Sequence, residues 1–253
     1  MMSELKTKLL KGEKLGGIMI RLLRNPAVAQ LIKNSGLDYF MYDCEHAMLD
    51  IETLHDTFLL ANALGIGAFV RVPAGNKEWI SRVLDAGANG IMVPMVENRK
   101  QAEILVKYSK YQPIGGRGYS GGIAYSGYIA GKHTDVMAEQ NSRVIAIAQI
   151  ETKDGVANAE EIASVEGIDA LLIGPNDLSI ALGIAGDLMN PIELEAISKV
   201  AAACKKCHKA FGLHAGPALL EKFKDDINLA MCSTDTDVLT NGFKGIGQTI
   251  RSM

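Results

Sequence analysis

The chain has 253 residues, of which 48% are hydrophobic and 22% are charged, and its formal net charge is −3. This composition supports a large buried core and excludes a disordered chain. The small negative charge gives no indication of a nucleic acid or an anionic membrane as a partner.

The sequence predicts neither a targeting signal nor a cysteine-based site. Residues 1–12 are charged and have no apolar core like that of a signal peptide, and no apolar run approaches the roughly 20 residues of a transmembrane helix. Cys204-Lys-Lys-Cys207-His208 has the letters of a haem-attachment motif. However, the helical periodicity of Pro191–Lys209 puts Cys204 on a buried face and leaves Cys207 and His208 towards solvent. Cys44 and Cys232 do not complete a zinc site, so we expect reduced cysteines and a cytoplasmic protein.

Eight short apolar runs alternate with helical segments. The runs predict strands at Gly16–Ile20, Tyr39–Asp43, Ala68–Val72, Gly90–Pro94, Val144–Glu151, Ala170–Ile173, Phe211–His214 and Leu229–Cys232. The other segments predict helices at Pro26–Ser35, Ile51–Leu64, Lys77–Ala86, Arg99–Lys110, Asp135–Gln140, Asn158–Ser164, Pro191–His208, Pro217–Lys224 and about Asp237–Arg251. Eight strand–helix repeats without a break in composition predict one closed (β/α)8 barrel over residues 1–253. An open doubly wound sheet is the alternative, but no G-x-G-x-x-G follows the first strand.

A long glycine-rich connection, from Tyr111 to about Gly131, interrupts this alternation. A connection of this length inside a compact domain is usually functional, although it can also be a tolerated insertion.

Carboxylates follow two consecutive strands of the predicted barrel. Val144–Glu151 ends on Glu151, and Asp177 comes shortly after Ala170–Ile173. The segment between these strands has the length of a crossover helix, so the strands are parallel and bring both acids to one end of the sheet. Two carboxylates at one end are a common basis for a divalent metal site.

Further polar side chains are predicted at the same end, where the active sites of such barrels lie. Asp43-Cys44-Glu45-His46 ends the second strand, Arg71 lies near the end of the third, and Asn176 follows the sixth. Strand alternation places Gln149 and Glu151 at the mouth of the barrel, with Ile145 and Ile147 filling its interior. This set offers ligands for a cation, a positive group for a substrate carboxylate, and a base.

Each signal also has a purely structural explanation. Arg71 and Glu151 could form an internal ion pair, and Asp43 could cap the turn that begins at Glu45. Asp177 and Ser179 could only begin a helix, because both residue types are good N-caps.

Other reaction types lack their signature residues. No lysine is predicted to point into the barrel, which disfavours a Schiff-base aldolase. There is no G-x-S-x-G motif, which disfavours a serine hydrolase.

Six motifs together resemble the HpcH/HpaI aldolase family, from about Gly16 to the C-terminus. They are Asp43-Cys44-Glu45-His46, Arg71-Val72-Pro73, Asp85-Ala86-Gly87-Ala88, Gly116-Arg117-Gly118, Gln149-Ile150-Glu151-Thr152 and Gly174-Pro175-Asn176-Asp177-Leu178-Ser179. The resemblance implies a barrel of the phosphoenolpyruvate/pyruvate type. It also implies a metal-dependent class II aldolase that cleaves a 4-hydroxy-2-oxo (2-keto-3-deoxy) acid to pyruvate and an aldehyde.

The resemblance also implies a role for each matching residue. Glu151 and Asp177 hold Mg2+ or Mn2+, and Arg71 binds the pyruvoyl group with Gln149 beside it. His46, oriented by Asp43, is the acid/base. Asn176 and Asp177 contact the substrate, and Asp85 reaches the His46 of a neighbouring subunit. Members of the family form homo-hexamers, as trimers of dimers that exchange their last helix, so the resemblance implies this assembly too.

Three positions depart from the family pattern and leave the aldehyde half undetermined: Tyr125, where a basic residue is common; His214, where the family is usually apolar or small; and Ser233, where glycine is usual. The hydroxyls of a small polar aldehyde would meet the Gly115–Gly122 loop and the ends of the last two strands. Two other functions stay open, an acyl-CoA lyase of the citrate lyase β-subunit type and a non-catalytic binding protein.

Overall fold

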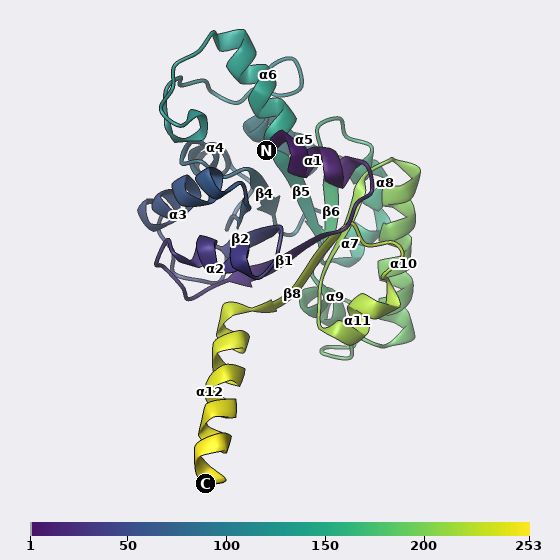
Figure 1. Ribbon diagram of the computed structural model, residues 1–253. Helices are drawn as coiled ribbons and strands as arrows, with labels where there is room; N and C mark the ends of the chain where they lie inside the picture. The colour runs from purple at the N-terminus through teal and green to yellow at the C-terminus, as the bar shows by residue number, and fades with distance from the viewer. Residues whose placement is uncertain (1) are drawn as a thin grey trace.

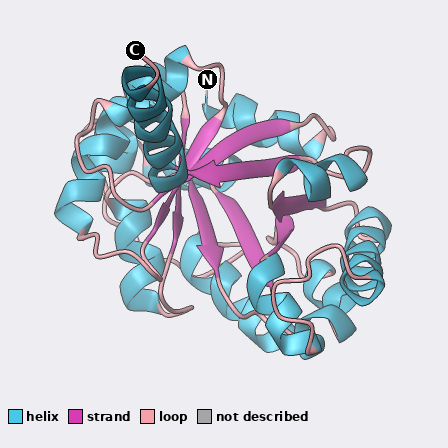
Figure 2. Ribbon diagram, turned by 90° about the horizontal axis from the view of Figure 1, so that it is seen from below, coloured by secondary structure: helices cyan, strands magenta, loops and turns pink. Residues whose placement is uncertain are grey.

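Eight parallel strands close into a barrel in the computed structural model, which describes residues 2–253 (Figures 1 and 2). The strands follow one another around the barrel in chain order, and β8 pairs with β1. They are Leu15–Ile20 (β1), Tyr39–Asp43 (β2), Gly67–Arg71 (β3), Gly90–Val93 (β4), Ile145–Ile150 (β5), Ala170–Ile173 (β6), Ala210–His214 (β7) and Leu229–Thr234 (β8). The prediction of a (β/α)8 barrel is confirmed, and the predicted strand ends differ by at most two residues.

The inside of the barrel is filled by large side chains that glycines accommodate. Tyr39 and Phe69 stack with their ring centroids 4.7 Å apart. A Cβ on Gly17 would overlap the Tyr39 ring, and a Cβ on Gly90 would overlap the Phe69 ring. The predicted interior positions of Ile145 and Ile147 are confirmed, because both lie with Phe69 in the apolar cluster inside the barrel.

Helices surround the barrel, as Figure 2 shows. They are Met2–Leu10 (α1), Val28–Asn34 (α2), Ile51–Leu64 (α3), Lys77–Asp85 (α4), Arg99–Ser109 (α5), His133–Arg143 (α6), Lys153–Ala157 (α7), Ala159–Ala163 (α8), Pro175–Leu182 (α9), Pro191–Lys206 (α10), Pro217–Lys222 (α11) and Asp235–Arg251 (α12), with a 3-10 turn at Ala124–Ser126. Asparagine and aspartate side chains begin several of them: Asp50, Asn76 and Asn98 each accept a hydrogen bond from the backbone N–H three residues later.

The helix prediction was incomplete in three places. The sequence did not predict α1 or α9, and it predicted one helix, Asn158–Ser164, where α7 and α8 meet at Asn158. Pro175 begins α9 directly after β6, and Gly183 ends it in the left-handed conformation. The first turn of α9 therefore follows the end of β6 directly.

Lys6 of α1 belongs to a buried charge cluster at the amino ends of the strands. Its Nζ is 2.9 Å from Asp169 Oδ1, and Lys110 Nζ is 2.9 Å from Asp169 Oδ2. Both ammonium groups also donate to the Val144 carbonyl just before β5. These contacts hold α1 against the end of the barrel at which the strands begin.

The glycine-rich connection also lies at the amino ends of the strands, because α5 runs back antiparallel to them. Arg117 in this connection pairs with Asp85 at the end of α4, with Nη2 2.6 Å from Oδ1. The Arg117 guanidinium is buried and lies over the rings of Tyr111 and Tyr125. The expectation that the Gly115–Gly122 loop meets the aldehyde within the same chain is therefore wrong.

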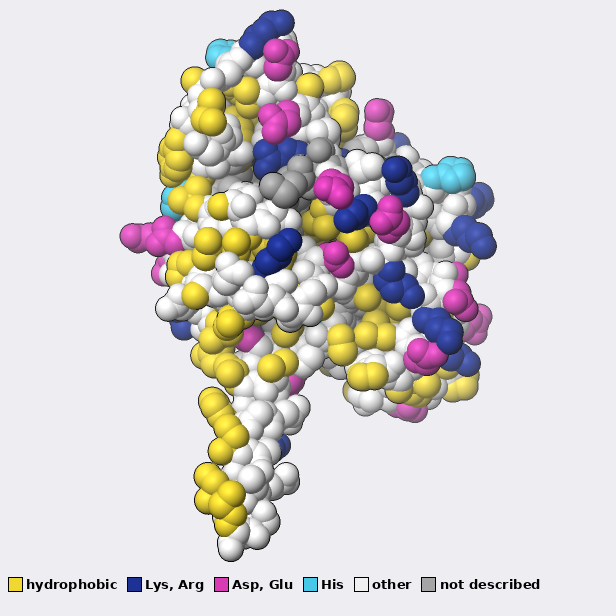
Figure 3. Space-filling model, viewed as in Figure 1, with side chains coloured by type: hydrophobic (Ala, Val, Ile, Leu, Met, Phe, Trp, Pro, Cys, Tyr) yellow, Lys and Arg dark blue, Asp and Glu magenta, His cyan; other side chains and the backbone are white. Residues whose placement is uncertain are grey.

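The last helix, α12, projects away from the barrel beyond the carboxyl end of β8 (Figure 1). Figure 3 shows apolar side chains gathered along one side of it. They include Val238, Phe243, Ile246 and Ile250, each of which is more than half exposed. Within residues 2–253, no helix has the length and hydrophobicity needed to cross a membrane.

Candidate active site

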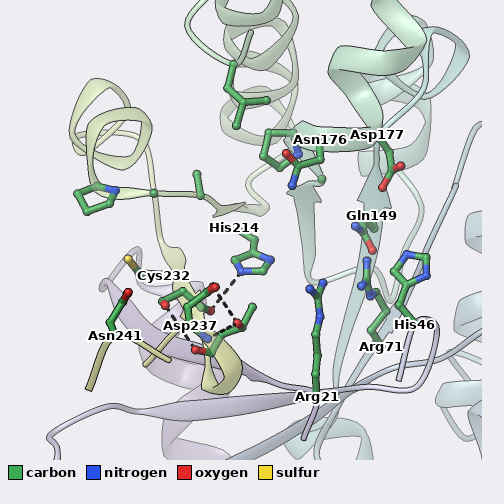
Figure 4. Close-up of a pocket in the computed structure, with 18 residues that line it drawn as sticks. Arg21, His46, Arg71, Gln149, Asn176, Asp177, His214, Cys232, Asp237 and Asn241 are labelled. Atoms are coloured by element: carbon green, nitrogen blue, oxygen red, sulfur yellow. Dashed lines mark hydrogen bonds between the residues drawn. The ribbon is translucent and has the colours of Figure 1, made fainter. Parts of the chain in front are cut away.

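A pocket of about 460 Å³ opens at the carboxyl ends of the strands. Figure 4 shows charged and amide side chains from several strand ends turned towards it. The polar side chains that line it are Arg21, His46, Arg71, Gln149, Asn176, Asp177, His214, Ser233, Thr234, Asp237 and Asn241. The pocket therefore brings together five of the eight site residues that the sequence predicts: His46, Arg71, Gln149, Asn176 and Asp177. Asp43 and Glu151 lie behind this lining, hydrogen-bonded to Arg71 and Gln149.

Arg71 at the end of β3 is the buried cation of the site. Its Nε and Nη2 donate to the two oxygens of Asp43 over 2.9 and 2.7 Å, and its Nη1 is 3.1 Å from Glu45 Oε2. Burial opposes ionisation of Asp43, but the hydrogen bonds and charge of Arg71 hold the pKa of this carboxyl below its usual value. Asp43 thus fixes the Arg71 guanidinium in place as a permanently charged group.

The ion pairs of Arg71 test the suggestion that this residue pairs with Glu151. Its ion pairs are with Asp43 and Glu45, so the suggested internal ion pair with Glu151 is wrong.

His46 follows β2 and presents a half-exposed imidazole, 55% accessible, to the pocket. Its backbone N–H donates to Asp43 Oδ1 over 3.3 Å, and its Nε2 lies 3.7 Å from Glu45 Oε2. Asp43 therefore closes the turn, as one alternative suggested, and holds His46 through the backbone. The carboxylate beside the imidazole is that of Glu45, a residue that the sequence analysis did not single out for a role.

Glu151 lies just beyond β5 and is almost fully buried. Its Oε1 accepts the Met95 N–H over 2.9 Å, and its Oε2 accepts Gln149 Nε2 over 2.6 Å. Burial, above all, raises the pKa of Glu151 to about 7; the Met95 N–H opposes this shift, and the charges of Glu45 and Asp177 add to it. The carbonyl oxygen of Gln149 is buried without a hydrogen-bond partner among the described residues.

Gly174, the residue that precedes α9, makes this arrangement possible. A Cβ at this position would lie 2.6 Å from Gln149 Nε2 and overlap Glu151 Oε2. Only a glycine lets the end of β6 pass this close to the two side chains of β5.

Asp177 occupies the first turn of α9 and points towards the pocket (Figure 4). It caps no helix: the N-cap position belongs to Gly174, which makes no side-chain bond, and the Ser179 hydroxyl donates to the Asn176 carbonyl. The suggestion that Asp177 is an N-cap is therefore wrong, although the residue does lie at the start of a helix, and its exposed carboxylate is available for a ligand.

The donor set fits a hard divalent cation. Glu151 and Asp177 both follow strands at the carboxyl end of the barrel, and the negative charges of Asp177 and Glu45 add to the raised pKa of Glu151, an effect that a bound cation would oppose. Among residues 2–253, no three His, Cys, Asp or Glu side chains are grouped tightly enough to hold a metal by themselves. Glu151 and Asp177 would hold the cation, leaving other positions for water or substrate oxygens, as Mg2+ prefers.

The last two strands contribute His214 and Ser233, two departures from the family pattern. Burial lowers the pKa of His214 to about 4, and its Nε2 lies 3.4 Å from the Ser233 carbonyl. The imidazole lines the pocket as a neutral group. The third departure, Tyr125, is at the far end of the barrel, where its hydroxyl donates to the Ser120 carbonyl.

Asp85 also lies at the far end, on α4, so it cannot serve the pocket of its own chain. Its carboxylate neutralises the buried Arg117. Arg21 was not predicted as a site residue, although it directly follows β1 and lines the pocket, so its position at a strand end could have indicated it.

The known proteins that this chain resembles in sequence and in fold include aldolases. A model of the family described as HpcH/HpaI aldolase/citrate lyase matches residues 18–226. The chain is 35% identical over 193 residues to a 5-keto-4-deoxy-D-glucarate aldolase of Klebsiella pneumoniae subsp. pneumoniae, covering 76% of this chain and 75% of that protein. It is 36% identical over 217 residues to a hydroxypyruvate/pyruvate aldolase of Delftia acidovorans, covering 83% and 77%. The solved HpcH/HpaI aldolase of Desulfitobacterium hafniense DCB-2 is similar with a TM-score of 0.93 at 30% identity, over 98% of this chain and 97% of that one.

Proposed function

The chain belongs to the HpcH/HpaI aldolase/citrate lyase family, and on that premise we propose that it is a divalent-metal-dependent lyase that cleaves a 4-hydroxy-2-oxo acid to pyruvate and an aldehyde. The observation that carries the proposal is that Arg71 and Asp177 line one pocket, while Glu151 lies directly behind it, hydrogen-bonded to the pocket residue Gln149. The buried guanidinium of Arg71 and the carboxylates of Glu151 and Asp177 come from the ends of β3, β5 and β6. The relatives named above are aldolases, which favours this reaction over that of an acyl-CoA lyase.

The residues of the chain can perform the steps of such a cleavage. The half-exposed imidazole of His46 is suited to take the proton from the 4-hydroxyl group. As the C3–C4 bond breaks, negative charge develops on the 2-oxo oxygen, and the fixed positive charge of Arg71 stabilises it. A proton then returns to C3 to give pyruvate.

The metal of this proposal is Mg2+ or Mn2+, held by Glu151 and Asp177. When bound, such an ion supplies Lewis-acid polarisation of the 2-oxo group. Gln149 keeps Glu151 in place through its 2.6 Å hydrogen bond.

The experiment compares two variants with a matched control. Glu151→Ala and Asp177→Ala should each lower Mg2+-dependent pyruvate release from a panel of 4-hydroxy-2-oxo acids by at least about 100-fold. Asp154→Ala removes a carboxylate from the exposed first turn of α7 and should leave the rate unchanged. Full activity in either of the first two variants would refute the metal assignment.

We also propose that the protein is a homo-oligomer, with the homo-hexamer of the family as its form. Supporting this are the four exposed apolar residues on the projecting helix α12: Val238, Phe243, Ile246 and Ile250. An apolar stripe of this kind on a soluble protein usually marks an interface. Phe243→Asp should reduce the mass measured by light scattering, whereas Lys244→Asp, on the same helix, should not; an unchanged mass in Phe243→Asp would contradict the proposed role of α12.

A further inference from the structure

Arg21, at the end of β1, is a second cation in the pocket, and the proposed reaction gives it no role. Its backbone is firmly held: the N–H groups of residues 21, 22 and 23 all donate to the carboxylate of Asp235 over 2.8–2.9 Å. Asp235 is itself buried at the start of α12. The side chain therefore starts from a fixed point at the pocket wall.

The guanidinium of Arg21 is only partly engaged. Its Nε donates to Asp43 Oδ2 over 2.9 Å. Across the described residues 2–253, nothing accepts a hydrogen bond from its Nη1 or Nη2, and the side chain is 38% exposed. Figure 4 shows this fork turned into the pocket, between His214 and Arg71.

Asp43 sets the spacing of the two cations. Arg21 Nε and Arg71 Nη2 bond to the same oxygen, so the two nitrogens cannot be farther apart than the two bond lengths together, about 5.6 Å. A substrate that occupies Arg71 with its 2-oxo acid end therefore reaches Arg21 within a few bonds.

The surroundings favour an anion at Arg21. A free guanidinium fork matches the two oxygens of a carboxylate. His214 beside it stays neutral at pH 7, because burial lowers the pKa of the imidazole to about 4. The acidic group on this side of the pocket, Asp237, already accepts a hydrogen bond from Thr234 Oγ1 over 2.8 Å.

We propose that Arg21 binds a carboxylate attached directly to the carbonyl carbon of the aldehyde, so that the substrate is a five-carbon 4-hydroxy-2-oxo dicarboxylate. The terminal carboxylate carbons of such a chain, when extended, are roughly 5 Å apart, since each C–C bond is about 1.5 Å. This separation lies within the upper bound of about 5.6 Å that the shared Asp43 oxygen sets on the distance between Arg21 Nε and Arg71 Nη2. The inference rests on the proposed aldolase function and adds the substrate class to it.

The reaction that tests it runs in the direction of synthesis. Pyruvate loses a C3 proton, its C3 bonds to the carbonyl carbon of glyoxylate, and the new alkoxide takes up a proton. The sum of pyruvate and glyoxylate is the five-carbon product, and no other reactant is consumed.

Two aldehydes of similar size distinguish an effect on carboxylate binding from an effect on the carbon–carbon bond-forming reaction itself. Glyoxylate carries the carboxylate, and glycolaldehyde has a hydroxymethyl group in its place. With pyruvate and Mg2+ or Mn2+, the unmodified enzyme should prefer glyoxylate. Arg21→Gln should lower kcat/KM for glyoxylate by about 10- to 100-fold, as expected for the loss of charge-assisted hydrogen bonds, and should change kcat/KM for glycolaldehyde by less than about threefold.

Two further variants serve as controls. Arg21→Lys keeps the charge without the fork and should restore part of the preference for glyoxylate. Arg24→Gln removes the same charge from the same segment, at an exposed residue whose Nη2 donates to the Met48 carbonyl outside the pocket, and should alter neither reaction.

Equal losses with both aldehydes in Arg21→Gln would overturn the inference, because a residue that only supports Asp43 would affect both reactions alike. An unchanged preference in Arg21→Gln would overturn it as well. In both cases the enzyme would still add pyruvate to an aldehyde, so the proposed function would stand. Failure of the unmodified protein with both aldehydes, together with no metal-dependent exchange of pyruvate protons, would instead reject the proposed function and this inference with it.

Discussion

Substitution of Gly174 by alanine tests how precisely the β5 and β6 ends are fitted together. The new Cβ would lie 2.6 Å from Gln149 Nε2, whereas ordinary van der Waals contact begins near 3.4 Å, so the amide must move by about 0.8 Å. That movement breaks the hydrogen bond from Gln149 to Glu151. A misplacement of about 1 Å in a catalytic site costs roughly 100-fold in rate, and overpacking costs about 1–3 kcal/mol of unfolding free energy.

We therefore expect kcat/KM for pyruvate formation to fall by roughly 100-fold in Gly174→Ala, and Tm to fall by about 2–10 °C. Gly216→Ala is the matched control, because Gly216 lines the same pocket but a Cβ there would meet nothing within 4 Å. Circular dichroism should show both variants folded at the assay temperature. Activity within threefold of the unmodified enzyme in folded Gly174→Ala would refute the close approach described here.

Three further predictions concern stability. Asp169→Ala leaves Lys6 and Lys110 buried without a counter-charge and should lower the unfolding free energy measured in urea by about 3–5 kcal/mol. A loss under about 1 kcal/mol would contradict the importance of this buried cluster. Glu193 is buried, its carboxylate oxygens have no hydrogen-bond partner among residues 2–253, and burial raises its pKa to about 7. The stability that depends on the neutral form of Glu193 is thus complete below about pH 4.5 and is lost as the pH rises through 7. Glu193→Gln should therefore have an unfolding free energy about 1–3 kcal/mol higher than that of the unmodified protein at pH 8, but not at pH 4.5. Parallel profiles of unfolding free energy against pH for the two proteins would contradict this prediction. Asp85→Asn removes the charge partner of the buried Arg117 and should lower the unfolding free energy by about 2 kcal/mol, and an unchanged Tm would contradict the importance of that pair.

The sequence was sufficient to predict the barrel because each strand shows its own pattern of buried residues. Strand alternation correctly placed Ile145 and Ile147 inside and Gln149 at the mouth, since the period of two leaves no other choice once one face is buried. Short elements with weak periodicity were harder to predict. Helix α9 has only eight residues and begins at a proline directly after a strand, so its residues look like a loop in the sequence.

The site was predictable where function follows from position along a strand, and less so where it depends on contacts between strands. Arg71 and Asp177 were found from strand ends alone. That Arg71 pairs with Asp43 and Glu45 depends on packing across β2 and β3, which sequence spacing does not reveal. The glycine-rich connection was assigned to the wrong end of the barrel, because its length suggested function while the antiparallel course of α5 determines where it lies.

Proton exchange at C3 of pyruvate in D2O, followed by NMR, measures the pyruvate half of the reaction alone, because it needs no knowledge of the aldehyde. We expect exchange that requires Mg2+ or Mn2+ and that falls at least about tenfold in Arg71→Lys, which keeps the charge but loses the fork held by Asp43. No exchange with either metal, together with no metal binding by calorimetry, would contradict the assignment of this pocket as a metal-dependent pyruvate site.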